Sequence, residues 1–74
     1  MASICEQVEE GKTSWPELVG EEGECAVTTI EKENELVHAQ IIAEGTIIIE
    51  IYICDRVLVW VNDNGIVVTT PKVG

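Results

Sequence analysis

In the first half of the chain, apolar residues recur at helical spacing within one segment. From Glu22 to about Asn34, Ala26, Val27 and Ile30 share one face of a predicted helix. Glutamates crowd its first turn, where the helix dipole favours negative charge, and Asn34 suits its end. Because a glycine and two threonines weaken the helix, packing against a sheet must supply most of its stability.

The residues before this helix are mostly polar. From Ser14 to Gly20 the sequence predicts a compact turn or a single helical turn, with Pro16 at a first-helical position and Gly20 as the stop. Trp15 is its expected apolar anchor. Residues 1–10 are expected to form a flexible N-terminal tail, apart from whatever ties down Cys5.

The second half of the chain predicts three short strands rich in β-branched residues. The first runs from Val37 to Ala43 and the second from Val57 to Val61. Asn62 to Gly65 is a strong turn signal, and a third strand, from Ile66 to Thr70, ends at Pro71. With one helix covering one sheet face, residues 1–74 form a single α+β domain without repeats or a linker.

The segment between the first two strands, residues 44–55, has two interpretations. Periodicity alone favours a core strand, whose inward-facing residues would be Ile47, Ile49, Ile51 and Ile53. The outward-facing residues would be Thr46, Ile48, Glu50 and Tyr52. However, Gly45 before the run and Cys54-Asp55-Arg56 after it bracket the segment as a connection. An exposed connection this apolar has the character of an aggregation-prone window and therefore requires a functional reason.

Composition and charge restrict the possible partners. The chain has 14 acidic and 4 basic residues, a formal net charge of −10, and its cations are single and scattered: Lys12, Lys32, Arg56 and Lys72. Nucleic acid and anionic membranes need clustered cations, so neither is expected as a partner. An apolar content of 46% excludes a solvated acidic tail. A chain this short buries only about 60% of its unfolded surface, so its function must lie on the surface.

The residues able to carry chemistry are few. Cys5, Cys25 and Cys54 lack the spacing of a metal site, and one bridge plus one free thiol is the most economical arrangement. Cys25 lies opposite the apolar helix face, which predicts an exposed thiol and slow disulfide-linked dimerisation. His38 is the single histidine, and a zinc site or a catalytic triad would depend on it alone. We therefore expect no enzyme, metal or cofactor.

Five short motifs follow one another in order from Gly11 to Gly74. They are Gly11-Lys12-Thr13-Ser14-Trp15-Pro16-Glu17-Leu18-Val19-Gly20, Ile30-Glu31-Lys32-Glu33-Asn34, Gly45-Thr46, Asp55-Arg56-Val57 and Thr70-Pro71-Lys72-Val73-Gly74. In combination they resemble the potato inhibitor I family of plant serine-protease inhibitors. The resemblance implies a small wedge-shaped domain, with one helix on a mixed sheet. It also implies an extended loop between two parallel strands that enters a protease active site like a substrate.

The resemblance also implies a disulfide and a binding loop. Cys5 would pair with Cys54, which closes about 50 residues and stabilises the fold by about 4 kcal/mol in the chain-entropy model. Cys25 has no counterpart in that arrangement, and a monomer is expected. The protease-binding loop would comprise Thr46, Ile47, Ile48, Ile49, Glu50, Ile51, Tyr52 and Ile53.

Alignment of the loop places the primary specificity position on Glu50 and the scissile bond between Glu50 and Ile51. Glutamate is unsuited to the aspartate-bearing pocket of trypsin and costly to desolvate in a chymotrypsin-like pocket. It suits a pocket with histidine or cationic partners, so a glutamate-specific serine endopeptidase is one expected target. The alternative is a subtilisin-like or chymotrypsin/elastase-like target that tolerates Glu50, with apolar contacts from Ile48, Ile49 and Tyr52.

The loop departs from the family's pattern in its support. The family has a threonine before and an acid after the specificity residue, and two arginines from the second strand bond to that pair. Here the loop positions hold Ile49 and Ile51, and the arginine positions hold Arg56 and Leu58. If nothing replaces the missing contacts, the loop would be cleaved and the chain would inhibit only temporarily.

Two replacements for the missing contacts are open. Arg56 would hold Glu50, backbone carbonyls or the Gly74 carboxylate, or the two isoleucines would pack on Leu58 as a small apolar support. A degenerate, non-inhibitory defence or storage protein is a further alternative to an inhibitor acting in plant defence and the response to wounding. The bridge favours an extracellular or vacuolar location, whereas a start at Met1 without a leader keeps a cytoplasmic one open.

Overall fold

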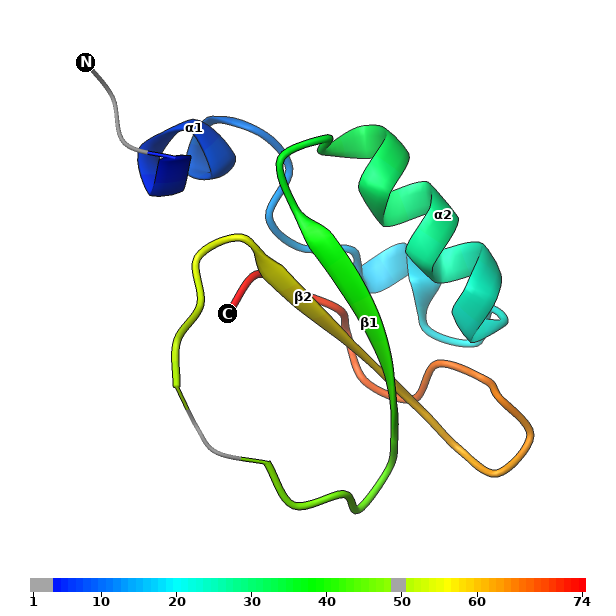
Figure 1. The fold of residues 1–74 in the computed structure, drawn as a ribbon. Coiled ribbons are helices and arrows are strands. Elements are labelled where there is room, and N and C mark those ends of the chain that lie inside the picture. Colours follow the sequence, from blue (N-terminus) through cyan, green and yellow to red (C-terminus); the bar gives the residue numbers. More distant parts are fainter. Residues whose placement is uncertain (1–3, 49–50) are drawn as a thin grey trace.

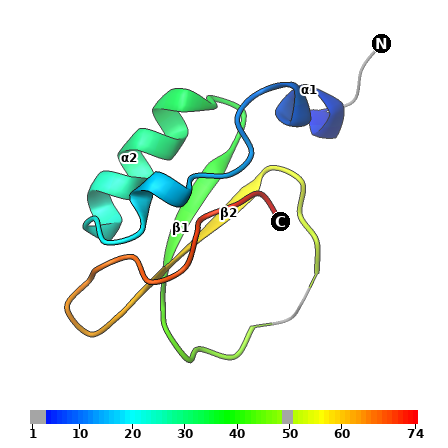
Figure 2. The ribbon, with the colours of Figure 1, turned by 180° about the vertical axis from the view of Figure 1, so that it is seen from behind.

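Two parallel strands and one main helix form the frame of the molecule. The computed structural model describes residues 4–48 and 51–74 (Figures 1 and 2). Its elements, in chain order, are α1 (Ile4–Glu10), the 3-10 turn η1 (Pro16–Leu18), α2 (Gly23–Glu33), β1 (His38–Ala43) and β2 (Arg56–Val61). Helix α2 covers one face of the β1–β2 pair, which confirms the predicted α+β class.

The pairing of β1 with β2 is parallel, and its register runs from His38 opposite Arg56 to Ala43 opposite Val61. Alternate residues of β2 are buried, Val57, Val59 and Val61, and they belong to the core with α2. Parallel neighbours cannot be joined by a tight turn, so the chain must travel back along the sheet before β2 begins. The described parts of this connection, residues 44–48 and 51–55, lie outside the sheet (Figure 1).

Helix α2 confirms the predicted amphipathic segment. Ala26 and Ile30 are buried, and Val27 packs against the core from its edge. The first helical residue, Gly23, lies so close to the sheet that a Cβ there would be 2.9 Å from Val61 Cγ1. A glycine is therefore required where the helix meets β2, although glycine has a poor helix propensity.

The N-terminal segment contains a helix that the sequence analysis missed. Residues 4–10 form α1, and Val8 is completely buried in the core. Ile4 and Val8 lie one helical turn apart, but a single apolar pair in a short, mostly polar segment is too brief to predict a helix. The mobility expected of a tail over residues 1–10 stays a prediction, and residues 1–3 lie outside the described residues.

The prediction of a third strand over Ile66–Thr70 is wrong. The turn before it forms as expected, with Gly65 at φ 77° and Asn62 Oδ1 accepting hydrogen bonds from the backbone N–H of Asn64 (2.9 Å) and Ile66 (3.1 Å). After the turn the chain changes partner at each step, because Ile66 bridges Glu22 and the next residue, Val67, bridges Val61. A ladder cannot form when successive residues pair with different segments.

Two buried residues, Trp15 and Asn34, join the N-terminal segment to the rest of the fold. Trp15, the predicted anchor, is fully buried. Asn34 is buried just after α2, where its Nδ2 donates hydrogen bonds to Val8 O and Lys12 O, both at 3.1 Å, and its Oδ1 accepts from Leu36 N at 3.2 Å. Because two of these bonds join the end of α2 to α1 and to the segment after it, Asn34 does more than end a helix.

No helix in the described part of the chain is long and apolar enough to cross a membrane.

We predict that Asn34→Ala lowers the free energy of unfolding by about 2–4 kcal/mol, because it removes three hydrogen bonds of a buried amide, to Val8 O, Lys12 O and Leu36 N. Urea denaturation followed by tryptophan fluorescence measures the change. Asn64→Ala is the matched control, since Asn64 is exposed and only its backbone N–H is bonded in the turn. Equal effects of the two substitutions would contradict the structural role given to Asn34.

Candidate functional site

The most exposed apolar surface of the molecule is the connection between β1 and β2. Ile47 is 96% exposed, Ile51 58% and Ile53 40%. In Figures 1 and 2 this connection bows away from α2 as an open loop. The interpretation of residues 44–55 as a core strand is therefore wrong, because Ile47, Ile51 and Ile53, which it would bury, are exposed. Ile49 and Glu50 lie outside the described residues.

The ends of the loop are tied to the sheet by backbone hydrogen bonds. At the start, Glu44 N donates to Val61 O at 2.7 Å, and Thr46 N donates to Ala43 O at 3.1 Å. Gly45 between them has a φ of 86°, a conformation that other residues adopt only with strain. At the end, Arg56 N donates to Ile53 O at 3.1 Å. The loop thus leaves the sheet through a glycine turn and returns through another tight turn.

A disulfide fixes the far end of the loop to the N-terminal helix. Cys5 on α1 is bonded to Cys54, with 5.3 Å between their Cα atoms and a sequence separation of 49. This is the pairing that the family resemblance implied. Cys25 is exposed on α2 and takes no part in a disulfide, in agreement with its place on the predicted helix. A dimer linked through Cys25 stays a prediction.

Arg56 connects the loop to the C-terminal residue. Its Nη2 donates to Ile51 O and its Nε donates to Gly74 O, each at 2.9 Å, while Gly74 N donates to Arg56 O at 2.8 Å. Of the partners that the sequence left open for Arg56, these bonds correspond to a loop carbonyl and the Gly74 terminus. A guanidinium can make both because its donors point in fixed, diverging directions.

The remaining predicted support residue is Leu58, which lies two residues after Arg56 on the same face of β2. It is half-buried and lines a shallow groove with Trp60 on the sheet face opposite α2. Packing of Leu58 against Ile49 and Ile51 stays a prediction, since Ile49 lies outside the described residues. His38 is exposed at the start of β1, where its backbone N–H donates to Asp55 O at 2.7 Å.

The other basic group with described side-chain partners lies away from the loop. Lys12 pairs with Glu17 and, at 3.2 Å, with Glu33. The hydrogen bond from the ammonium group lowers the pKa of Glu17, and the same bond raises the pKa of Lys12. Both groups are exposed, so solvent screens the pair. Lys12 therefore belongs to the turn at η1, and Arg56 is the cation that contacts the loop.

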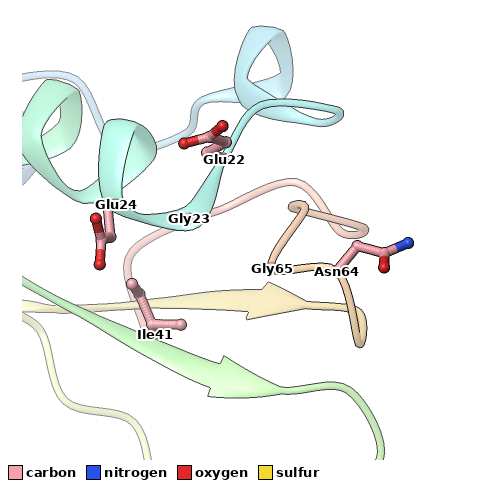
Figure 3. A pocket seen from close by; sticks show the side chains of 6 residues that line it. All are labelled: Glu22, Gly23, Glu24, Ile41, Asn64 and Gly65. Carbon is pink, nitrogen blue, oxygen red and sulfur yellow. The ribbon is translucent and has the colours of Figure 1, made fainter.

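A hollow at the start of α2 is separate from the loop (Figure 3). Its lining residues are Glu22, Gly23, Glu24, Ile41, Asn64 and Gly65. The glutamates bring negative charge to it, and Gly23 N donates to Gly65 O at 2.9 Å across its floor. Among the residues that the structure describes, no group of three His, Cys, Asp or Glu side chains could hold a metal ion.

Comparison with known proteins places this loop in a family. Residues 6–74 match the Potato inhibitor I family. A proteinase inhibitor of Linum usitatissimum is 48% identical over 63 residues, which are 85% of this chain and 91% of that protein. A "Glu S.griseus protease inhibitor" of Momordica charantia is 46% identical over 65 residues, 88% of this chain and 96% of the relative.

A solved structure is similar over the same region. The crystal structure of bitter gourd trypsin inhibitor superposes with a TM-score of 0.85 at 48% identity, and the match covers 86% of this chain and 94% of that one. Family match, close relatives and fold agree with the exposed loop, its disulfide and the parallel strands that carry it. The chain belongs to the potato inhibitor I family of serine-protease inhibitors.

Proposed function

We propose that this chain inhibits glutamate-specific serine endopeptidases, with Glu50 as primary specificity residue and Glu50–Ile51 as the reactive bond. The observation that carries the proposal is the hydrogen bond from Arg56 Nη2 to Ile51 O, because it holds the residue that directly follows Glu50. A loop held before binding loses little conformational entropy when it enters an active site, so its affinity comes from preorganisation.

The proposed mechanism uses the ordinary chemistry of the protease. The catalytic serine attacks the Glu50 carbonyl, and the oxyanion hole stabilises the developing charge. When the Glu50–Ile51 bond breaks, the Cys5–Cys54 bridge still joins the two pieces, and Arg56 still holds Ile51 O. The inhibitor supplies no catalytic group; it supplies a substrate whose products do not leave.

Support for the glutamate preference comes from electrostatics and from one relative. Trypsin presents an aspartate at the base of its pocket, so a Glu50 carboxylate would be repelled there. A pocket with cationic or histidine partners would instead form charge-assisted hydrogen bonds with it. The Momordica charantia relative is named for a glutamate protease of S. griseus. Other relatives are named for trypsin, so membership of the family does not by itself give the target, and the proposal depends on Glu50.

A second candidate target is a subtilisin-like or chymotrypsin/elastase-like protease. Exposed Ile47, Ile51 and Tyr52 offer apolar contacts on both sides of Glu50. An Amaranthus caudatus relative that is 46% identical over 63 residues is named a trypsin/subtilisin inhibitor. Such a target would bind the loop through these neighbours and leave the Glu50 carboxylate in water. A non-inhibitory protein, in which Leu58 fails to replace the second arginine, would bind neither class.

We predict that Glu50→Gln weakens inhibition of a glutamate-specific endopeptidase by about 10- to 100-fold, because a charged hydrogen bond is replaced by a neutral one of the same shape. Inhibition constants are measured against that enzyme and against subtilisin. Glu50→Leu is the paired variant and should bind subtilisin better than the natural chain does. Equal inhibition of the glutamate-specific enzyme by the natural chain and Glu50→Gln would favour the second candidate.

We predict that Arg56→Ala converts the chain into a temporary inhibitor. The substitution removes two charge-assisted hydrogen bonds, so the inhibition constant should rise about 10- to 100-fold and cleavage at Glu50–Ile51 should accelerate. Arg56→Lys should fall between, because one ammonium cannot reproduce the guanidinium's two directions. Lys32→Ala is the control, because it also removes one positive charge, from an exposed position on α2. Mass spectrometry during incubation follows the cleavage, and unchanged kinetics for Arg56→Ala would refute the support assigned to Arg56.

A further inference from the structure

The two halves of the loop are held unequally. After residue 50, Ile51 O accepts the Arg56 guanidinium, Ile53 O accepts Arg56 N, and Cys54 is bonded to Cys5. Before residue 50, Thr46 N bonds to the turn, whereas residues 47 and 48 make no hydrogen bond within the described part of the chain. Cleavage at residue 50 would therefore separate a held half from a loosely held one.

Tyr52 lies within the held half and beside the C-terminal residue. A Cβ added to Gly74 would lie 3.6 Å from Tyr52 Cδ2 and 3.7 Å from Cε2, so one edge of the ring faces Gly74 at close range. Gly74 is itself fixed by two hydrogen bonds with Arg56. The residue before it, Val73, packs against the core and bridges Val57 on β2. The ring thus rests on a rigid extension of the sheet.

We infer that Tyr52 is a positioning residue, which acts through Gly74 to keep the Ile51 amine in place after cleavage. The inference rests on the proposed function. Arg56 bonds to Ile51 O, and the ring of the next residue, Tyr52, faces Gly74, so successive residues of the half that carries the new amine lie against the same support. Two successive residues held on one rigid surface fix both the position and the direction of the backbone between them.

The step that Tyr52 controls is religation. In the acyl-enzyme, the Glu50 carbonyl is esterified to the catalytic serine, and Ile51 has become a free amine. When that amine attacks the ester, the amide bond forms, the serine–acyl bond breaks, and the amine proton passes through the catalytic histidine to the serine oxygen. Water attacking the same ester would instead leave a Glu50 carboxylate. An amine held within reach competes at a high effective concentration, and water has no such advantage.

Tyr52 is 64% exposed, so its other face is open to a bound protease, and a simple loss of affinity would not identify its role. The two roles differ in kinetics. A direct contact with the enzyme affects how tightly the cleaved chain binds, which is read from KM for religation. A positioning role affects the bond-forming step, which is read from kcat. Exposure also means that changes at this position leave the core intact.

The experiment uses the two-chain form cleaved at Glu50–Ile51, which the Cys5–Cys54 bridge keeps together. A catalytic amount of a glutamate-specific endopeptidase is added, and mass spectrometry follows the loss of one water as the intact chain forms again. We expect Tyr52→Ala to lower kcat for religation about tenfold with little change in KM, because small misplacements of a reacting group are costly. Tyr52→Phe retains the ring edge and should religate within about twofold of the natural chain.

Deletion of Gly74 tests whether Tyr52 acts through the C-terminal residue. If it does, Tyr52→Ala and the deletion have non-additive effects, and the double variant religates little more slowly than the deletion alone. Additive effects, or a change confined to KM, overturn the inference. Equal religation rates for Tyr52→Ala and the natural chain overturn the inference as well. If the natural chain still inhibits the enzyme in that case, the proposed function stands. Absence of both inhibition and cleavage by every protease tested overturns the two proposals together.

Discussion

The parallel pairing of β1 with β2 is the constraint on which the rest of the molecule depends. Each strand has six residues, about 20 Å, and the chain must cover that distance in reverse before β2 can begin. Residues 44–55 do so without a helix, although a helix is the usual crossover between parallel strands. One sheet face already carries α2, so the return path bows into solvent as an extended loop. The topology therefore leaves the segment between β1 and β2 as an exposed connection.

Holding such a segment requires contacts from distant parts of the sequence, because the core of this chain is small. Asn34 ties the end of α2 to α1 and the segment after it, and the Cys5–Cys54 bridge ties α1 to the end of the loop. Arg56 lies at the start of β2 and joins the loop to Gly74. The Asn34, disulfide and Gly74 connections each link parts of the chain that are distant in sequence, so they remove conformational freedom that a peptide of the same loop sequence would retain.

In this chain Arg56 supports the loop through a backbone carbonyl, whereas the family's pattern implies support through side chains. The resemblance implies two arginines that bond to a threonine and an acid, yet Ile51 offers only its carbonyl, and that is what Arg56 binds. A backbone carbonyl is present whatever the side chain, so this bond tolerates an apolar Ile51. With Leu58 at the second arginine position, the residues after Glu50 carry most of the described support. An asymmetric loop of this kind would hold the amine product more firmly than the acyl product.

The sequence by itself determined the helix of α2, the buried Trp15, the turn at Asn62–Gly65 and the family, because each has a local pattern. Helix α1, the interrupted pairing after Gly65 and the buried amide of Asn34 depend on partners far away in the chain, and no local pattern reports them. The isoleucines of the loop show the limit most clearly. Their alternation indicates that the two faces of an extended segment differ. Only the tertiary structure decides whether either face is covered, because burial depends on which other segments pack against it.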